Sequence, residues 1–201
     1  MNAPKKRVAR LMRDFIFDEE KHQFIVDGQQ WPSITQILGD EGFIDTAWFT
    51  EYGRERGRLL HKIIHWHITD ELDETSISPV LQGRFNAWLA FEKDSGFKSI
   101  ETEKPRINDV YRFGGIPDHF CTIFGKKAIV DVKSGVSPAW VGLQLAAQEI
   151  LIGGFHLRYS LQLKDNGKYS LKPYTDHQDQ AVFLSALACW QWKQNNLKGR
   201  K

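Results

Sequence analysis

Two carboxylates and a lysine stand close together in the middle of the chain. Asp118 follows a proline, and Asp131 and Lys133 end the apolar run Ala128–Lys133. In an extended strand, residues two apart point to the same face, so Asp131 and Lys133 share one side while the valines beside them face the other. Burying charge is costly, so this pair on an apolar strand indicates a purpose beyond packing.

The chain between the two aspartates predicts how they meet. Gly125 suits a tight turn between the runs that carry Asp118 and Asp131, and folding about it brings Asp118 opposite Asp131 and Lys133. Paired carboxylates can hold Mg²⁺ or Mn²⁺ through oxygen while leaving water and phosphate on the ion. Such an ion activates water and offsets phosphate charge. The lysine can steer or deprotonate that water, or stabilise the charge that develops on the phosphorus. The alternative is a salt-bridged hairpin tip at the surface.

The order Pro117-Asp118, then Asp131-Val132-Lys133, resembles the PD-(D/E)XK nuclease superfamily. The Gly-Gly-Ile-Pro-Asp run that ends at Asp118, and the expected helix carrying Gln144 and Gln148, are similar to its RecB-like and phage exonuclease-like branch. That branch reads Gln-x-x-x-Tyr in this helix. Gln144 matches the motif, but Gln148 stands where tyrosine is expected, which leaves its role open.

The resemblance implies further site residues upstream. Gly57 to His61 matches the Gly-x-x-x-His motif of the branch, in which the histidine lies close to the metal. The family also supplies a glutamate from the strand before the Pro-Asp strand; Glu103 is the candidate by its spacing from Gly115, with Glu101 as the rival. The implied metal-binding groups are Asp118, Asp131, Glu103, His61 and the backbone carbonyl of Val132. The implied catalytic residues are Asp118, Asp131, Lys133 and Gln144.

The resemblance implies a deoxyribonuclease that requires Mg²⁺ or Mn²⁺ and hydrolyses DNA phosphodiester bonds, as a phage or prophage exonuclease does in recombination, repair or DNA processing. It leaves open exonuclease against endonuclease action, strand polarity, assembly into a homo-oligomer and contact with a recombination or replication protein. The alternative function is a catalytically silent DNA-binding or assembly module that retains the nuclease fold. Two separate cysteines, Cys121 and Cys189, exclude a four-cysteine iron–sulfur cluster.

The elements that must position these residues are a mixture of helices and strands. Strands are predicted over Phe15–Asp18, His22–Val26, Ser99–Arg106, Val110–Phe124, Ala128–Lys133, His156–Leu163 and Lys168–Tyr174. Helices are predicted over Ser33–Leu38, Thr46–Asp70, Val80–Lys93, Ser137–Ile152 and Asp176–Trp192. We therefore expect one α/β domain over residues 1–201: a restriction-endonuclease-like core with a mixed central sheet flanked by helices, an N-terminal hairpin and a helical extension.

Composition supports a globular intracellular protein. Of 201 residues, 41% are apolar and 26% charged, and 27 basic side chains against 25 acidic ones give a net charge of +2. Residues 1–14 are basic and are expected to form a flexible arm. The arm and the cluster Arg54, Arg56 and Arg58 could contact phosphates, or could be solvated surface. No apolar run approaches the ~20 residues that span a bilayer, so we expect a cytoplasmic protein with no membrane partner.

Overall fold

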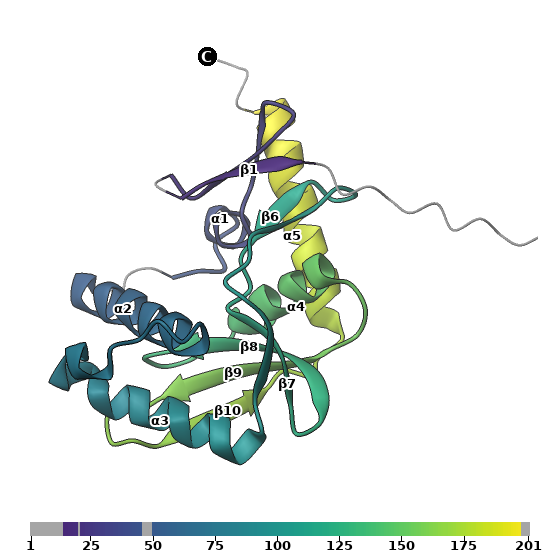
Figure 1. Ribbon diagram of the computed structural model, residues 1–201. Helices are drawn as coiled ribbons and strands as arrows, with labels where there is room; N and C mark the ends of the chain where they lie inside the picture. Colours follow the sequence, from purple (N-terminus) through teal and green to yellow (C-terminus); the bar gives the residue numbers. More distant parts are fainter. Residues whose placement is uncertain (1–13, 20, 46–49, 198–201) are drawn as a thin grey trace, which may run out of the picture.

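A five-stranded mixed sheet forms the centre of the molecule, in a computed structural model that describes residues 14–19, 21–45 and 50–197 (Figure 1). The strand order is β10-β9-β8-β7-β4. Its strands are β4 (Lys98–Thr102), β7 (His119–Ile123), β8 (Lys126–Lys133), β9 (Leu157–Leu163) and β10 (Tyr169–Pro173). The predicted fold class, a mixed sheet flanked by helices with an N-terminal antiparallel hairpin, is confirmed.

The sheet is mixed because of a single crossover. β8 and β9 are parallel neighbours, whereas the other three pairs in the sheet are antiparallel. Parallel neighbours cannot be joined by a tight turn. The chain therefore crosses over through α4 (Val141–Ile152), which ends at Gly153 with a φ of 80°. As a result α4 lies against the sheet next to the strand that carries Asp131 and Lys133.

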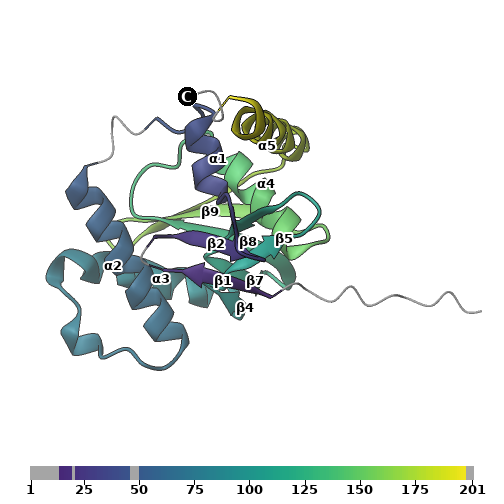
Figure 2. The same cartoon turned by 90° about the horizontal axis from the view of Figure 1, so that it is seen from above.

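One face of the sheet is covered by α2 (Glu51–Ile68) and α3 (Pro79–Ser95), which the view from above places on the side opposite α4 and α5 (Figure 2). The Thr50 side chain accepts a hydrogen bond from the Gly53 N–H and caps the start of α2. The short 3-10 helix η1 (Glu74–Ser76) lies between the two helices. Buried side chains that join these helices to the sheet include Leu60, Ile64, Phe85, Trp88, Val130 and Val132.

The other face is covered by α4, with α5 (Gln178–Asn196) and α1 (Ile34–Asp40) packed beyond it. Ser33 caps α1 by accepting a hydrogen bond from the Gln36 N–H at 3.1 Å. Ile129 of β8 is buried against α4. Asp131 and Lys133 follow Ile129 at intervals of two residues, so they extend from the face of the sheet that α4 covers.

The N-terminal segment builds a separate three-stranded antiparallel sheet of β1 (Phe15–Asp18), β2 (Gln23–Val26) and β3 (Gln29–Trp31). It meets a two-stranded sheet of β5 (Arg106–Asn108) and β6 (Phe113–Gly115). At Gly114 a β-carbon would lie 2.5 Å from the Phe24 ring, so only glycine allows this contact. The glycine pair before Pro117 therefore has a packing role.

Three sequence predictions about these elements are wrong. The run Ser99–Arg106 is not one strand, because β4 ends at Thr102 and β5 begins at Arg106 in a different sheet. The run Val110–Phe124 is not one strand, because Ile116 to Asp118 separates β6 from β7. The Ser137-Pro138 pair does not begin α4, which starts at Val141; the Ser137 hydroxyl instead bonds to the Ser160 hydroxyl of β9. The predicted basic arm and the first part of the predicted helix from Thr46 fall on residues 1–13 and 46–49, outside the described residues. None of the helices in the described ranges has the length and hydropathy needed to cross a bilayer.

Candidate active site

A tight hairpin brings Asp118 to the end of β8. Phe124 and Gly125 form its two-residue turn, both with positive φ (50° and 72°), as turns that match the twist of paired strands require. The register set by this turn runs from Ile123 opposite Lys126 to His119 opposite Val130. One residue further, the Asp118 Oδ2 accepts a 2.8 Å hydrogen bond from the Val132 N–H. The carboxylate of Asp118 thus lies beside the strand that carries Asp131.

Asp131 is held below the surface by a lysine on its own strand. Its side chain is only 1% exposed, and its Oδ2 lies 2.7 Å from the Lys133 Nζ. Its Oδ1 has no hydrogen-bond partner among the described residues. Burial raises the pKa of Asp131 to about 6 against the opposing effect of Lys133. The pKa of Lys133, which burial alone would lower, is raised because Asp131 and Asp118 favour its charged form.

His61, a residue of α2, lies between Asp118 and Glu103. Its Nδ1 lies 3.7 Å from Asp118 Oδ2 and 3.7 Å from Glu103 Oε1. Burial acts to lower the pKa of His61, but Asp118, Glu103 and Asp131 outweigh it and raise the pKa to about 9. Glu103 reaches this position just after β4 with a φ of 49°, and its N–H donates to the Asp118 carbonyl at 2.9 Å. A non-glycine residue in this left-handed region marks a locally strained site.

The two glutamates that the sequence leaves as rivals have different partners. Glu101 pairs with Arg106 and, at 3.2 Å, with Lys104. Burial would raise its pKa, but these two cations lower it. Glu103, in contrast, faces His61. The arrangement therefore favours Glu103 over Glu101 as a member of the site.

A second histidine, which the sequence analysis did not include, also faces Glu103. His65 lies one helical turn after His61 on α2, and its Nδ1 is 3.5 Å from Glu103 Oε2. Each carboxylate oxygen of Glu103 is thus next to one imidazole. The sequence signal was available, because residues four apart share a helix face. It could be interpreted only once the position of Glu103 was known.

The site opens into a cavity of about 510 Å³. Glu103 and Asp118 line it on one side, with Gln144 and Gln148 of α4. Gln148 is 1% exposed, and the side-chain oxygens of both glutamines have no hydrogen-bond partner within the described part of the chain. An unpaired buried amide oxygen is costly unless a ligand or water satisfies it. The rest of the wall includes Phe17, His22, Ser33, Thr35 and Ile116.

The side chains have the donor chemistry that Mg²⁺ or Mn²⁺ prefers, because carboxylate and carbonyl oxygens predominate. The unpartnered, buried Asp131 Oδ1 fits such a cation. In this structure, however, these side chains are paired with basic groups: Asp131 with Lys133, and Asp118 and Glu103 with His61. Among the described residues, no three or more histidine, cysteine, aspartate or glutamate side chains are grouped so that they could hold a metal ion. A cation would therefore have to draw Asp118, Asp131 and Glu103 away from their present partners.

Comparison with known proteins adds only distant structural similarity. No protein-family model matches this chain, and no curated protein matches it. A solved structure described as the crystal structure of LHK-Exo in complex with dAMP is similar, with a TM-score of 0.37 and 14% sequence identity, over 84% of this chain and 94% of that one. The function proposed below is therefore argued from this chain's own residues.

Proposed function

We propose that this protein is a metal-dependent deoxyribonuclease of the PD-(D/E)XK type, related to the RecB-like and phage exonuclease-like branch. One observation carries the proposal. Asp118 and Asp131 lie on neighbouring segments of one hairpin, joined by the 2.8 Å hydrogen bond to Val132, and the Lys133 amine is 2.7 Å from Asp131. In this arrangement the two carboxylates can bind a divalent metal ion and the amine can act on the water or the phosphate, as phosphodiester hydrolysis requires.

Asp118, Asp131 and Glu103, with His61 and the Val132 carbonyl, would hold Mg²⁺ or Mn²⁺. When bound, the ion supplies Lewis-acid activation of the phosphate and of the attacking water. The carboxylates bring their negative charge to a position fixed by the sheet. Asp131 lies on β8, and Asp118 and Glu103 are each one residue from the end of a strand, so none of the three is carried by a long loop.

Lys133 acts in its protonated form. Its pKa is raised because Asp131 and Asp118 favour its charged form, so the protonated lysine is the form that we assign to the reaction. Its Nζ lies 5.5 Å from the centre of the Trp140 ring, a contact that also favours the cation. We assign it the orientation of the attacking water and the stabilisation of negative charge that develops on the phosphate.

Gln144 and Gln148 provide neutral polar contacts on the α4 wall of the cavity. A carboxamide offers both a donor and an acceptor, so Gln144 can donate to a phosphate oxygen while its own oxygen accepts from water. Gln148 occupies the position one turn later where the related branch has tyrosine. The carboxamide of Gln148 offers a carbonyl oxygen as an acceptor, whereas a tyrosine would offer a hydroxyl group at the end of a rigid ring.

The test is cleavage of linear and circular DNA with Mg²⁺, with Mn²⁺ and with EDTA. We expect cleavage by the unmodified chain in either metal, loss of at least about 100-fold in rate for Lys133→Met and for Asp118→Asn, and none with EDTA. The control is Lys126→Met, which removes an exposed lysine from the same strand. Degradation of linear DNA alone indicates an exonuclease. Unchanged rates in both site variants would reject the assignment.

A second candidate is a DNA-binding or assembly module that keeps this architecture without cutting. The observation in its favour is that Asp131 and Glu103 are already paired with Lys133, His61 and His65, so no ready-made group of metal ligands is present in the described chain. DNA binding by the folded protein, together with no cleavage and no heat of Mg²⁺ or Mn²⁺ binding in calorimetry, would favour this candidate.

A further inference from the structure

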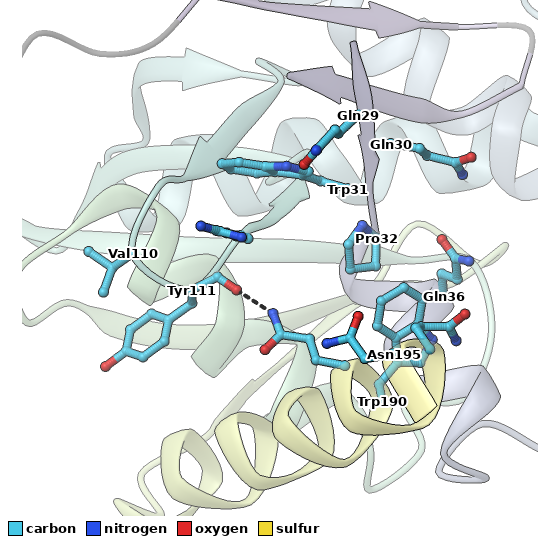
Figure 3. A pocket seen from close by; sticks show the side chains of 12 residues that line it. Gln29, Gln30, Trp31, Pro32, Gln36, Val110, Tyr111, Trp190 and Asn195 are labelled. Atoms are coloured by element: carbon cyan, nitrogen blue, oxygen red, sulfur yellow. Dashed lines mark hydrogen bonds between the residues drawn. The ribbon is translucent and has the colours of Figure 1, made fainter. Parts of the chain in front are cut away.

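A second cavity, of about 670 Å³, lies apart from Asp118 and Asp131 (Figure 3). Three segments line it: residues 29–36, which form β3 and the start of α1, the loop before β6 and the last turns of α5. Figure 3 shows Val110 and Tyr111 on one side, Trp31 above, and Trp190 with Asn195 on the other. A cavity of this size is in the range that holds one or two nucleotides or a similar small ligand.

The side chains around this cavity form an unusual set. Six carboxamides line it: Gln29, Gln30, Gln36, Gln191, Gln194 and Asn195. The lining also includes three aromatic rings, from Trp31, Tyr111 and Trp190, and the guanidinium of Arg112. The described residues that line it include no carboxylate. The cavity therefore offers hydrogen bonds, stacking faces and one positive charge.

Several of these groups are fixed in place. The Gln191 side chain donates a 2.8 Å hydrogen bond to the Tyr111 carbonyl, which ties α5 to the loop before β6. The Trp190 indole N–H donates to Asp40 at 2.7 Å. Trp31 is only 6% exposed, whereas Tyr111 is 41% exposed and free to meet a ligand. Groups held in position before binding lose less entropy when a ligand arrives.

The second cavity shares its walls with the candidate active site. The chain from residue 29 to 36 contributes Pro32 and Gln36 to the second cavity and Ser33 and Thr35 to the cavity beside Asp118. The chain from 110 to 118 divides in the same way, with Tyr111 in one and Gly115 to Asp118 in the other. Between them the two segments are joined by the bridge of Ser33 and Gly114. The two cavities therefore adjoin the same two segments of the chain.

We propose that this second cavity binds unpaired nucleotides of the DNA strand whose phosphodiester lies at Asp118 and Asp131. The inference rests on the proposed function and extends it. Tyr111 stacks on a base, Arg112 meets a phosphate, and the carboxamides contact base edges, which carry both donors and acceptors. Stacking and amide contacts of this kind require unpaired bases, so the cavity favours single-stranded over duplex DNA.

Proline-rich peptides are the competing occupant, since they too dock against aromatic rings. The observations favour nucleic acid. The cavity carries a guanidinium and no carboxylate, and Arg112 has no ion pair with any carboxylate that the structure describes. Residues of the same two segments also line the cavity beside Asp118.

The test measures binding of a fluorescein-labelled oligothymidylate of about 12 nucleotides to the unmodified full chain in EDTA, by fluorescence anisotropy. We expect Tyr111→Ala and Arg112→Gln each to weaken binding about tenfold. Lys164→Gln, at an exposed lysine between β9 and β10, removes the same charge and is expected to change binding less than twofold. Circular dichroism and thermal melting test whether each variant is folded. If Tyr111→Ala or Arg112→Gln does not fold, Gln194→Ala takes its place and is likewise expected to weaken binding about tenfold.

Competition with unlabelled ligands tests whether the cavity binds single-stranded DNA, duplex DNA or a proline-rich peptide. Unlabelled single-stranded DNA should displace the probe at lower concentration than blunt duplex. Equal binding by the pocket variants and the unmodified chain would overturn the inference, as would stronger competition by a proline-rich peptide than by single-stranded DNA. Because EDTA prevents metal-dependent cleavage, the outcome is independent of catalysis. A chain that binds through this cavity but does not cut would retain this inference and lose the proposed function.

Discussion

The Asp118 side chain accepts its hydrogen bond from the backbone N–H of Val132 at 2.8 Å, at the point where the β7–β8 ladder ends. In a continuing antiparallel ladder a backbone carbonyl would be the partner of such an N–H group. Here a carboxylate oxygen takes that place, so the position of the acid is fixed by the sheet. One change at Asp118 therefore affects both sheet pairing and the candidate chemistry, and two substitutions can separate the two effects.

Asp118→Asn should keep the fold and lose cleavage, whereas Asp118→Ala should lose both cleavage and stability. Asparagine retains an oxygen that can accept from Val132, but alanine leaves that N–H unsatisfied in a nearly buried position. We expect alanine to be less stable than asparagine by about 1–3 kcal/mol in urea unfolding. Equal stability of the two variants would show that the hydrogen bond contributes nothing to the fold.

Lys133→Met should destabilise the protein in a pH-dependent way. It removes the charge that lies 2.7 Å from the fully buried Asp131. The pKa of Asp131 is about 6 in the folded chain, above its ordinary value of 3.8, so this group destabilises the fold increasingly as pH rises from 3.8 through 6. Without the lysine that pKa should rise further, and the variant should lose about 3 kcal/mol at neutral pH and less at pH 4.

The double variant Asp131→Asn with Lys133→Met provides the control. It removes the charge together with its partner, so most of the stability at neutral pH should return. Chemical unfolding at a series of pH values measures both effects. The difference in unfolding free energy between Lys133→Met and the unmodified chain should be larger at pH 8 than at pH 4, and an equal difference at the two pH values would contradict the burial argument.

His61 should titrate far above an ordinary histidine. Its folded pKa is about 9 against 6.5 in the unfolded chain, since Asp118, Glu103 and Asp131 outweigh its burial. The stability it contributes is therefore fully present below pH 6.5 and is lost as pH rises through 9. NMR titration of the ring protons measures the midpoint directly, and His61→Gln identifies the signal.

Added Mg²⁺ should lower that midpoint. A divalent cation at Asp118 and Glu103 would offset the negative charge that keeps His61 protonated. EDTA should restore the original value, which makes this a measurement of metal binding that does not depend on cleavage. A midpoint that stays near 9 in saturating Mg²⁺ and Mn²⁺ would argue that no ion binds beside these carboxylates.

The convergence of Asp118 and Asp131 was accessible from sequence because it depends on local rules. Side chains alternate along a strand, and Gly125 sets a tight turn that fixes the register of the hairpin. The positions of α2 and α3 followed from apolar spacing in the same way. The start of α4 did not, because Ser137, despite its favourable neighbour Pro138, bonds to Ser160 on a strand distant in sequence.

The surroundings of Glu103 depend on contacts that sequence patterns do not encode. Its φ of 49° is unusual for glutamate and is maintained by the hydrogen bond from its N–H to the Asp118 carbonyl. The same holds for His65, which faces Glu103 only because the fold brings α2 next to the residue that follows β4. Likewise, the second cavity draws its lining from three segments far apart in the chain. Such sites require the tertiary arrangement.

Gly114→Ala should be costly although the change adds one methyl group. The new β-carbon would lie 2.5 Å from the Phe24 ring, which is fully buried and cannot move aside freely. We expect a loss of about 1–3 kcal/mol in unfolding free energy. Gly39→Ala is the matched control: it lies in α1 with open space around its β-carbon position, so it should gain about 0.5–1 kcal/mol. Similar changes in unfolding free energy for Gly114→Ala and Gly39→Ala would contradict the close contact of Gly114 with Phe24.

His119→Phe should make the protein more resistant to acid. His119 is 2% exposed and packs against Trp88 and Phe97. Burial, helped by the nearby His61, lowers its pKa to about 3. The unfolded chain therefore takes up a proton below pH 6.5 that the folded chain refuses, and the fold loses up to about 1.4 kcal/mol per pH unit between 6.5 and 3. Phenylalanine keeps the aromatic contacts and removes this cost. It also removes the 3.0 Å hydrogen bond between the His119 ring and the Thr102 hydroxyl, so the prediction concerns the change with pH and not the stability at one pH.

The comparison is the difference in unfolding free energy between His119→Phe and the unmodified chain from pH 7 down to pH 4. Asp131 has the opposite pH dependence, but it is present in both proteins and cancels in the difference. The difference should therefore move in favour of the variant as pH falls. His177→Gln, at an exposed histidine, controls for the loss of one imidazole. A constant difference across this range would mean that the His119 ring takes up its proton as easily in the folded chain as in the unfolded one.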